Sequence, residues 1–333
     1  MTTIAVLGSG SWGTAVAMLL AQKPNHRVRL WAANPTTAAA LLDRRENVRQ
    51  LPGVPIPESI EITSEPADAT RDAEVWFVAI PTKYLRRTLQ LLAPHASVAT
   101  PVVSLVKGLE LSTFLRPTQI IADVLGTSRV AVLSGPSHAE EVARGLPTSL
   151  VAASTDAELA SQVQRIAGGE RMRVYTNDDL IGVELAGALK NVLGVAAGIC
   201  DGLKYGDNSK AALLTRGLVE MQRFGVMNGA SPETFFGMAG IGDLIATCFS
   251  QHGRNRRIGE RLAQGETIDA IGDGPMVAEG VTTAKAVYER SQHVGLDMPI
   301  LSGVYKVLYE GLSPLVAVQA LLGRPQRCEK GKE

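Results

Sequence analysis

Short apolar runs alternate with helical patterns through the first half of the chain. These runs lie at residues 2–7, 26–33, 73–81, 100–108 and 129–137, and two more follow at 148–154 and 172–177. Most are separated by segments with apolar residues at helical spacing. The alternation predicts an α/β domain with a doubly wound, Rossmann-type parallel sheet over residues 1–176.

Helical periodicity replaces this alternation from Asp178 onward, which predicts an all-helical second domain over residues 177–333. Asp178 and Asp179 suit a helix N-terminus, where carboxylates meet unpaired N–H groups. One face of that helix carries residues at three-and-four spacing, namely Val183, Ala186, Lys190, Leu193 and Ala197.

Lys190 is the unexpected member of this apolar face, because a buried ammonium is costly unless something uses it. One interpretation is a buried stem whose amine reaches solvent. The other is an amine that faces a cleft between the domains, with its pKa lowered by burial and neighbouring cations. Glu184 and Asn191 lie on the same helix and are equally unusual among Ala, Val, Leu and Gly.

The first strand leads into the motif GxGxxG, formed by Gly8, Gly10 and Gly13. Such glycines permit a tight turn, close approach of a pyrophosphate and close packing of helix on strand. A glycine-rich turn without a ligand is the weaker alternative, because the motif lies between a strand and a helix.

The end of the second predicted strand bears on the choice between NAD and NADP. A carboxylate there would bind the ribose 2′-hydroxyl, whereas an arginine would accept a 2′-phosphate. This chain has Ala33 and Asn34 instead. Arg44 and Arg45 follow on the next helical stretch, although a solvated helix face is the simpler interpretation for them.

Further polar groups stand in the helical half. Within residues 206–225, Lys210, Arg216 and Glu220 are best explained by internal ion pairs. Asp243 precedes an apolar segment. A helix cap and a functional role are both open interpretations for it. Residues 250–265 begin a helix with Arg254, Asn255, Arg256 and Arg257, which suits either a phosphate or a solvated basic turn.

Composition argues against several function classes. The 333 residues include 33 Lys and Arg against 33 Asp and Glu, so no net charge favours nucleic acid. Cys200, Cys248 and Cys328 have no metal-ligand spacing, which predicts a reducing compartment and no metal. We find no signal-peptide pattern and no apolar run near the roughly 18–20 residues of a membrane span, so we expect a cytoplasmic protein.

Several motifs together resemble the bacterial NAD(P)-dependent glycerol-3-phosphate dehydrogenase family. In order along nearly the whole chain they are GSGSWGTA, VKGLE, LSGPSHAEEVA, ELAGALKNVLGVAAGICDGL, GDNSKAALLTRGLVEM, GIGDLIATC, GRNRRIG and VAEGV. The resemblance implies reversible hydride transfer between sn-glycerol 3-phosphate and dihydroxyacetone phosphate with NAD(H) or NADP(H). That reaction supplies glycerol 3-phosphate for phospholipid synthesis.

The resemblance also implies roles for residues. Lys190 matches the catalytic lysine, and the substrate set is Lys107, Gly135, Ser137, Lys190, Asp243, Gly253, Arg254 and Asn255. The cofactor set is Gly8, Gly10, Ser11, Trp12, Gly13, Ala33, Asn34, Lys107, Ala139, Arg254, Val277 and Glu279. Gly253 departs from the usual Ser, which removes a hydroxyl contact, and Ala33 departs from a frequent Arg, which leaves the preferred cofactor open.

In this interpretation Lys190 donates a proton to the oxygen that hydride addition makes negative. Lys107 tunes its pKa, Asp243 holds its amine, and Arg254 and Asn255 hold the phosphate. Two alternatives stay open, namely a 3-hydroxyacid dehydrogenase of the 6-phosphogluconate dehydrogenase type and a non-catalytic nucleotide sensor. We expect a small phosphorylated substrate, no nucleic-acid partner and no membrane insertion, and a homodimer is compatible with the sequence.

Overall fold

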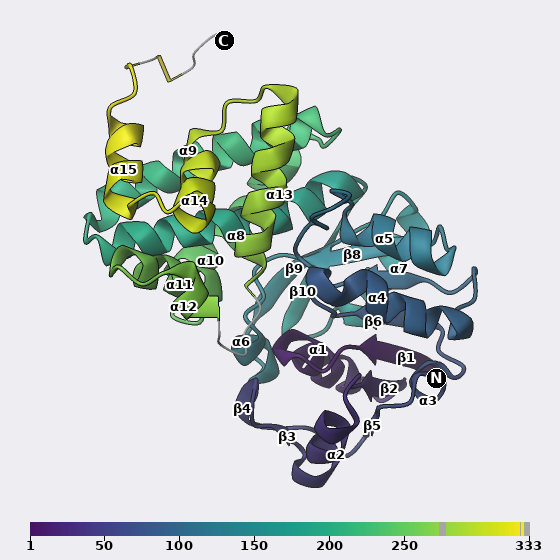
Figure 1. Ribbon diagram of the computed structural model, residues 1–333. Helices are drawn as coiled ribbons and strands as arrows, with labels where there is room; N and C mark the ends of the chain where they lie inside the picture. Colours follow the sequence, from purple (N-terminus) through teal and green to yellow (C-terminus); the bar gives the residue numbers. More distant parts are fainter. Residues whose placement is uncertain (273–277, 327, 330–333) are drawn as a thin grey trace.

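A mixed sheet and a group of helices form the two halves of the computed structural model, which describes residues 1–272, 278–326 and 328–329 (Figure 1). The sheet half contains β1 (Thr2–Leu7), α1 (Ser11–Ala21), β2 (His26–Trp31), α2 (Pro35–Arg44), β3 (Glu46–Asn47), β4 (Leu51–Pro55), β5 (Ile60–Thr63), α3 (Pro66–Thr70), β6 (Val75–Val78), α4 (Thr82–Leu92), η1 (Ala93–His95), β7 (Val102–Ser104), α5 (Pro117–Leu125), β8 (Val130–Ser134), α6 (Ala139–Ala143), β9 (Thr148–Ala153), α7 (Ala157–Ala167) and β10 (Met172–Asn177).

The helical half begins directly after β10. It contains α8 (Leu180–Gly202), α9 (Gly206–Met227), η2 (Pro232–Phe236), η3 (Met238–Gly242), α10 (Asp243–Phe249), α11 (Arg254–Ala263), α12 (Ile268–Gly272), α13 (Glu279–Val294), α14 (Pro299–Tyr309) and α15 (Pro314–Leu322). Asp179 caps α8 by accepting a hydrogen bond from Gly182 N at 2.8 Å, as expected for a helix start.

The sheet has eight strands in the order β10-β9-β8-β7-β6-β1-β2-β5. All neighbouring pairs are parallel except β8 and β9, which are antiparallel. The predicted Rossmann-type sheet is confirmed, and this one pair departs from a fully parallel sheet. The chain turns back after β8 through the five-residue helix α6, and so short a connection re-enters the sheet in the opposite direction.

Helices cover both faces of the sheet and explain why its central strands are apolar throughout. Helices α1 and α7 pack on one face, while α4 and α5 pack on the other. Strand β6 is buried at every position, as a strand covered on both faces must be. The hairpin of β3 and β4 and the edge strand β5 were not predicted from the apolar runs.

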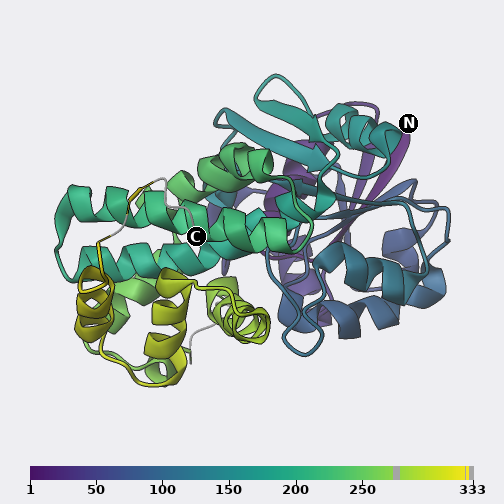
Figure 2. The same cartoon turned by 90° about the horizontal axis from the view of Figure 1, so that it is seen from above.

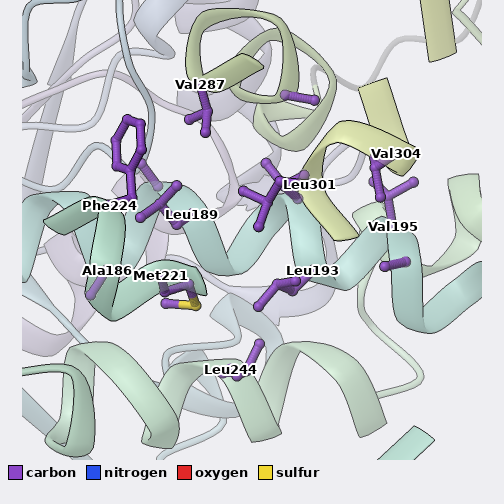
Figure 3. Close-up of a cluster of buried hydrophobic side chains, with 14 of the residues drawn as sticks. Ala186, Leu189, Leu193, Val195, Met221, Phe224, Leu244, Val287, Leu301 and Val304 are labelled. Carbon is purple, nitrogen blue, oxygen red and sulfur yellow. The ribbon is translucent and has the colours of Figure 1, made fainter. Parts of the chain in front are cut away.

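Helix α8 is the axis of the helical half, and Figure 3 shows apolar side chains packed around it. Helices α9, α10, α11, α13 and α14 all contact it. The predicted single apolar face of α8 is therefore incomplete, because the helix is buried on every side. A sequence stripe cannot reveal this, since small and large apolar residues occupy nearly all positions of the helix.

The expectation that no segment is long and apolar enough to cross a membrane is wrong for α8. By length and composition this 23-residue helix would suffice, since an 18-residue window within it has a mean hydropathy of 1.5, although 94% of that window is buried inside the protein. Counting uninterrupted apolar runs missed it because Glu184 and Lys190 break the run. Figure 2 shows the helical half beside the sheet half. The N-terminus lies at the end of the sheet half that is remote from the helical half.

Candidate active site

A cleft of about 200 Å³ lies between the two halves, and most of the predicted site residues line it. Its sheet-half wall comes from the start of α1 and from the segments that follow β6, β7 and β8. In open α/β sheets the ligand binds at these carboxyl ends of the strands. Helices α8, α10, α11 and α13 supply the other wall. A larger cavity of about 750 Å³ lies between α8, α9, α14 and α15, away from these groups.

Two lysines from different halves share one carboxylate in this cleft. Asp243 Oδ2 lies 2.7 Å from Lys107 Nζ, and Asp243 Oδ1 lies 3.0 Å from Lys190 Nζ. Lys190 also donates a hydrogen bond to the Thr247 hydroxyl. Lys190 is only 7% exposed. The interpretation in which the amine reaches solvent is therefore wrong. Asp243 is not the cap of α10, because both of its oxygens contact ammonium groups.

The pKa values of this cluster follow from burial and from the two positive charges. Burial lowers the pKa of Lys190 to about 8, Asp243 opposes that change, and Lys107 adds to it. Burial alone would raise the pKa of Asp243, but Lys107 and Lys190 together hold it below its usual value. At neutral pH the cluster therefore holds a carboxylate beside an ammonium that gives up its proton slightly above neutrality.

The ends of β7 and β8 hold Lys107 in place. Its Nζ donates to the Gly135 carbonyl at 2.8 Å and contacts the Ser137 hydroxyl at 3.0 Å. Gly135 has a φ of 124°, which favours glycine, and this turn aims its carbonyl at the lysine. The structure thus brings Gly135 and Ser137 to the lysine cluster, as the sequence predicted.

The start of α11 forms the opposite end of the cleft. Gly253 is its N-cap and contributes no side chain, so the first N–H groups of the helix are not capped from that position. A Cβ on Gly253 would lie 2.8 Å from the Thr247 carbonyl oxygen, so close packing of the backbone favours glycine at this position. Arg254 and Asn255 follow and both line the cleft.

The glycine motif fits a pyrophosphate. A Cβ on Gly8 would lie 2.7 Å from the Ala79 carbonyl oxygen, and a Cβ on Gly13 would lie 1.9 Å from the Gly8 oxygen. Gly10 is the N-cap of α1 and has no capping side chain, and the first turn of α1 has no acidic residue. Ser11 N donates to the Gln50 side chain at 3.1 Å, so this N–H is oriented toward an acceptor outside the helix.

Two buried polar atoms in the cleft also suit a cofactor. Trp12 Nε1 and Glu279 Oε2 have no hydrogen-bond partner within the described residues, and both side chains line the cleft. The other oxygen of Glu279 accepts a hydrogen bond from Thr82 N at 2.9 Å, which joins α13 to the sheet half. Burial raises the pKa of Glu279. Ala139 lines the cleft as well, whereas Val277 lies outside the described residues.

The end of β2 is open to solvent. Ala33 and Asn34 are exposed, and Asn34 caps α2 by accepting a hydrogen bond from Thr37 N at 3.1 Å. Arg45 forms an ion pair with Glu58 at 3.2 Å. Arg45 is half-buried at the C-cap of α2, so the expected solvated helix face is wrong for this residue. Its ion pair with Glu58 argues against a role in binding a 2′-phosphate.

Other predictions for the helical half have mixed outcomes. Lys210 forms the expected internal ion pair, with Asp201 Oδ2 at 2.8 Å. Glu220 forms no ion pair within the described residues, and its two oxygens accept hydrogen bonds from Ile300 N and Leu301 N at the start of α14. Its pattern on α9 looked like that of an ion-pair member, and nothing in the sequence marks a partner eighty residues away.

Several residues in and beside the cleft were not assigned from the sequence. Within it, Thr247 contacts Lys190, and Asn191 donates to the Lys107 carbonyl at 3.1 Å. Beside it, Thr82 N donates to the Glu279 carboxylate. Thr247 stands four residues after Asp243, one helical turn away, and this spacing is a signal that could have revealed it. Asn191 follows the lysine directly, and its polar side chain on a buried helix is a second signal.

Both halves of the chain match known families. Residues 3–160 match the family described as NAD-dependent glycerol-3-phosphate dehydrogenase N-terminus, and residues 179–319 match its C-terminus. A glycerol-3-phosphate dehydrogenase (NAD(P)+) of Chlorobium phaeobacteroides is 47% identical and aligns over 98% of this chain and 99% of its own length. The enzyme with the same name from Moorella thermoacetica is 48% identical over 98% and 97%.

A solved structure agrees with these matches. The crystal structure of glycerol-3-phosphate dehydrogenase from Coxiella burnetii superimposes with a TM-score of 0.91 at 38% sequence identity. The match covers 97% of this chain and 99% of that one. These likenesses favour the dehydrogenase interpretation over a 3-hydroxyacid dehydrogenase and over a non-catalytic nucleotide sensor.

Proposed function

Since the chain belongs to the NAD-dependent glycerol-3-phosphate dehydrogenase family, we propose that Lys190 is the group that transfers the proton in its reaction. The chain is an oxidoreductase that interconverts sn-glycerol 3-phosphate and dihydroxyacetone phosphate with NAD(H) or NADP(H). The observation that carries the proposal is the pair of lysines on one buried carboxylate, at 2.7 and 3.0 Å. A bound nicotinamide supplies or accepts the hydride.

The lysine cluster suits proton transfer in both directions. During reduction the ketone oxygen of dihydroxyacetone phosphate gains negative charge, and the Lys190 ammonium donates a proton to it. During oxidation the neutral amine accepts the proton from the hydroxyl. A pKa of about 8 makes both forms available near neutral pH, and Lys107 adds a second positive charge that attracts the developing oxyanion.

The substrate phosphate is assigned to the start of α11. Uncapped N–H groups at a helix N-terminus bind anions, and Arg254 adds a guanidinium to them. Lys190 and Lys107 would then face the carbon that changes oxidation state, while Arg254 and Asn255 hold the other end of the substrate. Contacts to a remote phosphate accelerate reduction by orienting the substrate, without taking part in bond-making.

The cofactor is assigned to the glycine motif and its surroundings. The start of α1, from Gly10 through Trp12, would hold the pyrophosphate, and Glu279 would reach the cofactor from the helical half. The exposed Ala33 and Asn34 neither repel a 2′-phosphate nor bind it with a positive charge, so we propose that both cofactors are used.

The remaining assignments concern organisation and location. We place the domain boundary directly after Asn177, one residue later than the sequence predicts, because β10 ends there. We place the protein in the cytoplasm, where it supplies glycerol 3-phosphate for phospholipid synthesis. The burial of α8 inside the helical half supports a protein that does not insert into membranes. Exposed Phe236, Ile245 and Phe249 support a homodimer that is formed through the helical half, which light scattering would test.

The decisive assay follows absorbance at 340 nm with NADH and NADPH side by side. We expect both to be oxidised with dihydroxyacetone phosphate and neither with a 3-oxoacid that carries a carboxylate instead of the phosphate. Activity on the 3-oxoacid at a comparable kcat/KM would contradict the assignment of the phosphate site. A preference above a thousandfold for one cofactor would contradict the assignment at the end of β2.

A further inference from the structure

Two buried asparagines join four elements of the cleft in one continuous chain of hydrogen bonds. Gly280 N donates to Asn255 Oδ1 at 3.1 Å, and Asn255 Nδ2 donates to Asn191 Oδ1 at 2.9 Å. Asn191 Nδ2 in turn donates to the Lys107 carbonyl at 3.1 Å. Asn191 is 6% exposed and Asn255 is 8% exposed, so water cannot readily replace these bonds.

The backbone groups at the two ends fix the orientation of both amides. Gly280 N–H can only donate, so it requires the oxygen of Asn255. The Lys107 carbonyl can only accept, so it requires the nitrogen of Asn191. The two amides then meet as one donor and one acceptor, and turning either amide over would oppose like groups.

Close packing leaves little freedom for this chain to rearrange. A Cβ on Gly280 would lie 2.6 Å from the Asn191 backbone oxygen and 2.7 Å from Asn255 Oδ1. A Cβ on Gly194 would lie 3.2 Å from the Asn255 Cβ. The glycines of α8 and α13 therefore allow the helices to approach closely enough for the amide chain to close.

Each end of the chain reaches a group with an assigned role. Lys107 contacts the Asp243 carboxylate, which also contacts Lys190. Asn255 stands at the start of α11, beside Arg254. Gly280 follows Glu279, whose carboxylate accepts from Thr82 N in the sheet half. The amide chain therefore links the lysine cluster, the phosphate end of the cleft and the cofactor side.

We infer that Asn191 and Asn255 form a positioning relay that holds the phosphate site in register with the lysine cluster. The inference rests on the proposed function, because it takes the start of α11 as the phosphate site. Asn255 donates only one of its two amide N–H groups to Asn191, and its side chain lines the cleft. The relay thus also fixes which side of that amide, the N–H side, is presented to the substrate. Asn191 acts through Asn255 and Lys107 and is a positioning residue.

The test is a double-mutant cycle with Asn191→Ala, Asn255→Ala and both together. Loss of one buried hydrogen bond that leaves its partner unsatisfied predicts a fall in kcat/KM for dihydroxyacetone phosphate of about 10- to 100-fold in each single variant. Because either change breaks the same chain of hydrogen bonds, kcat/KM of the double variant should lie no more than about threefold below that of the less active single variant. Single-variant losses that multiply in the double variant would overturn the relay.

Three measurements separate positioning from general destabilisation. The loss should lie mainly in KM, and the alkaline limb of the pH profile of kcat should stay in place, since the Asp243 contacts remain. Asn228→Ala is the matched control, because Asn228 Nδ2 donates to the Phe224 carbonyl at 2.7 Å in the same half but away from the cleft. It should leave KM unchanged. A rise in KM in this control equal to that of Asn191→Ala would overturn the inference.

A second variant covers failure to fold. Asn191→Leu keeps the branched shape of the side chain and removes its hydrogen bonds to Lys107, Gly187 and Asn255, and circular dichroism would confirm its fold. We expect the same rise in KM as for Asn191→Ala, and a wild-type KM in folded Asn191→Leu would overturn the relay. If the wild type itself fails to reduce dihydroxyacetone phosphate, the proposed function fails instead, and that result is read before any variant is made.

Discussion

Replacing Asp243 by Asn is the perturbation with the clearest electrostatic consequence. The change keeps the shape of the side chain and removes the charge that faces Lys107 at 2.7 Å and Lys190 at 3.0 Å. In Asp243→Asn the two ammonium groups would share a buried site with no carboxylate between them. The charged form of Lys190 is then disfavoured, so its pKa must fall.

The size of this fall follows from the contact distance. Two unit charges 3.0 Å apart attract each other by about 5–6 kcal/mol at an effective dielectric constant of about 20. Relaxation and water reduce the part that appears in titration, and an opposite charge at such a distance typically moves a pKa by about 1–3. We therefore expect the pKa of Lys190 to drop from about 8 to about 7 or lower.

The assay is the pH dependence of kcat in both directions. Reduction of dihydroxyacetone phosphate needs the ammonium, so its alkaline limb should move to lower pH in Asp243→Asn. Oxidation of glycerol 3-phosphate needs the neutral amine, so its acidic limb should move the same way.

Asp201→Asn is the control for this experiment. Asp201 also faces two cations, Lys210 at 2.8 Å and Arg256 at 2.6 Å, but it does not line the cleft. In Asp201→Asn both limbs of the pH dependence of kcat should stay at their wild-type positions. Limbs that do not move in a folded Asp243→Asn would refute the assignment of the titrating group to Lys190.

Three further predictions concern the phosphate, the cofactor and stability. Arg254→Ala should lower kcat/KM for dihydroxyacetone phosphate by about 1.5–3 kcal/mol, and equal losses on unphosphorylated dihydroxyacetone would assign Arg254 to another role. Values of kcat/KM with NADH and NADPH should lie within about thirtyfold, equivalent to about 2 kcal/mol, and Ala33→Arg should shift the ratio toward NADPH. An unchanged ratio would argue against contact at this strand end. Burial raises the pKa of Glu220 to about 7, so the folded state binds a proton more tightly than the unfolded state. Urea unfolding should therefore show stability falling by about 3 kcal/mol from pH 5 to pH 8, and an equal fall in Glu220→Gln would refute this.

The alternation of apolar runs and helical patterns predicted seven of the eight strands of the main sheet, but neither the edge strand β5 nor the hairpin of β3 and β4. The strands that begin at Thr2 and Val75 lie where their apolar runs predicted, because strands covered on both faces must be apolar throughout. The antiparallel pairing of β8 and β9 was not predictable. Strand direction depends on how the chain turns between them, and the apolar pattern is the same either way.

The lysine cluster was predicted less directly. Lys190 attracted notice because a charge on an apolar helix needs a reason, and the resemblance added Lys107 and Asp243 from distant segments. That both lysines contact the Asp243 carboxylate is a feature of the tertiary structure, which the sequence pattern does not show. Thr247 and Asn191 could not be assigned roles from the sequence, because their partners in the cleft, Lys190 and the Lys107 carbonyl, come close only in the folded chain.

The central claim is that Lys190 transfers the proton, and Lys190→Ala tests it most directly. A general acid contributes about 10²–10⁴ in rate, so kcat for reduction should fall by that factor. The Kd for NADH, followed by protein fluorescence, should stay within about twofold of the wild type, and added ethylamine should restore part of the rate. A folded variant that keeps more than about a tenth of the wild-type kcat without added amine would contradict the account.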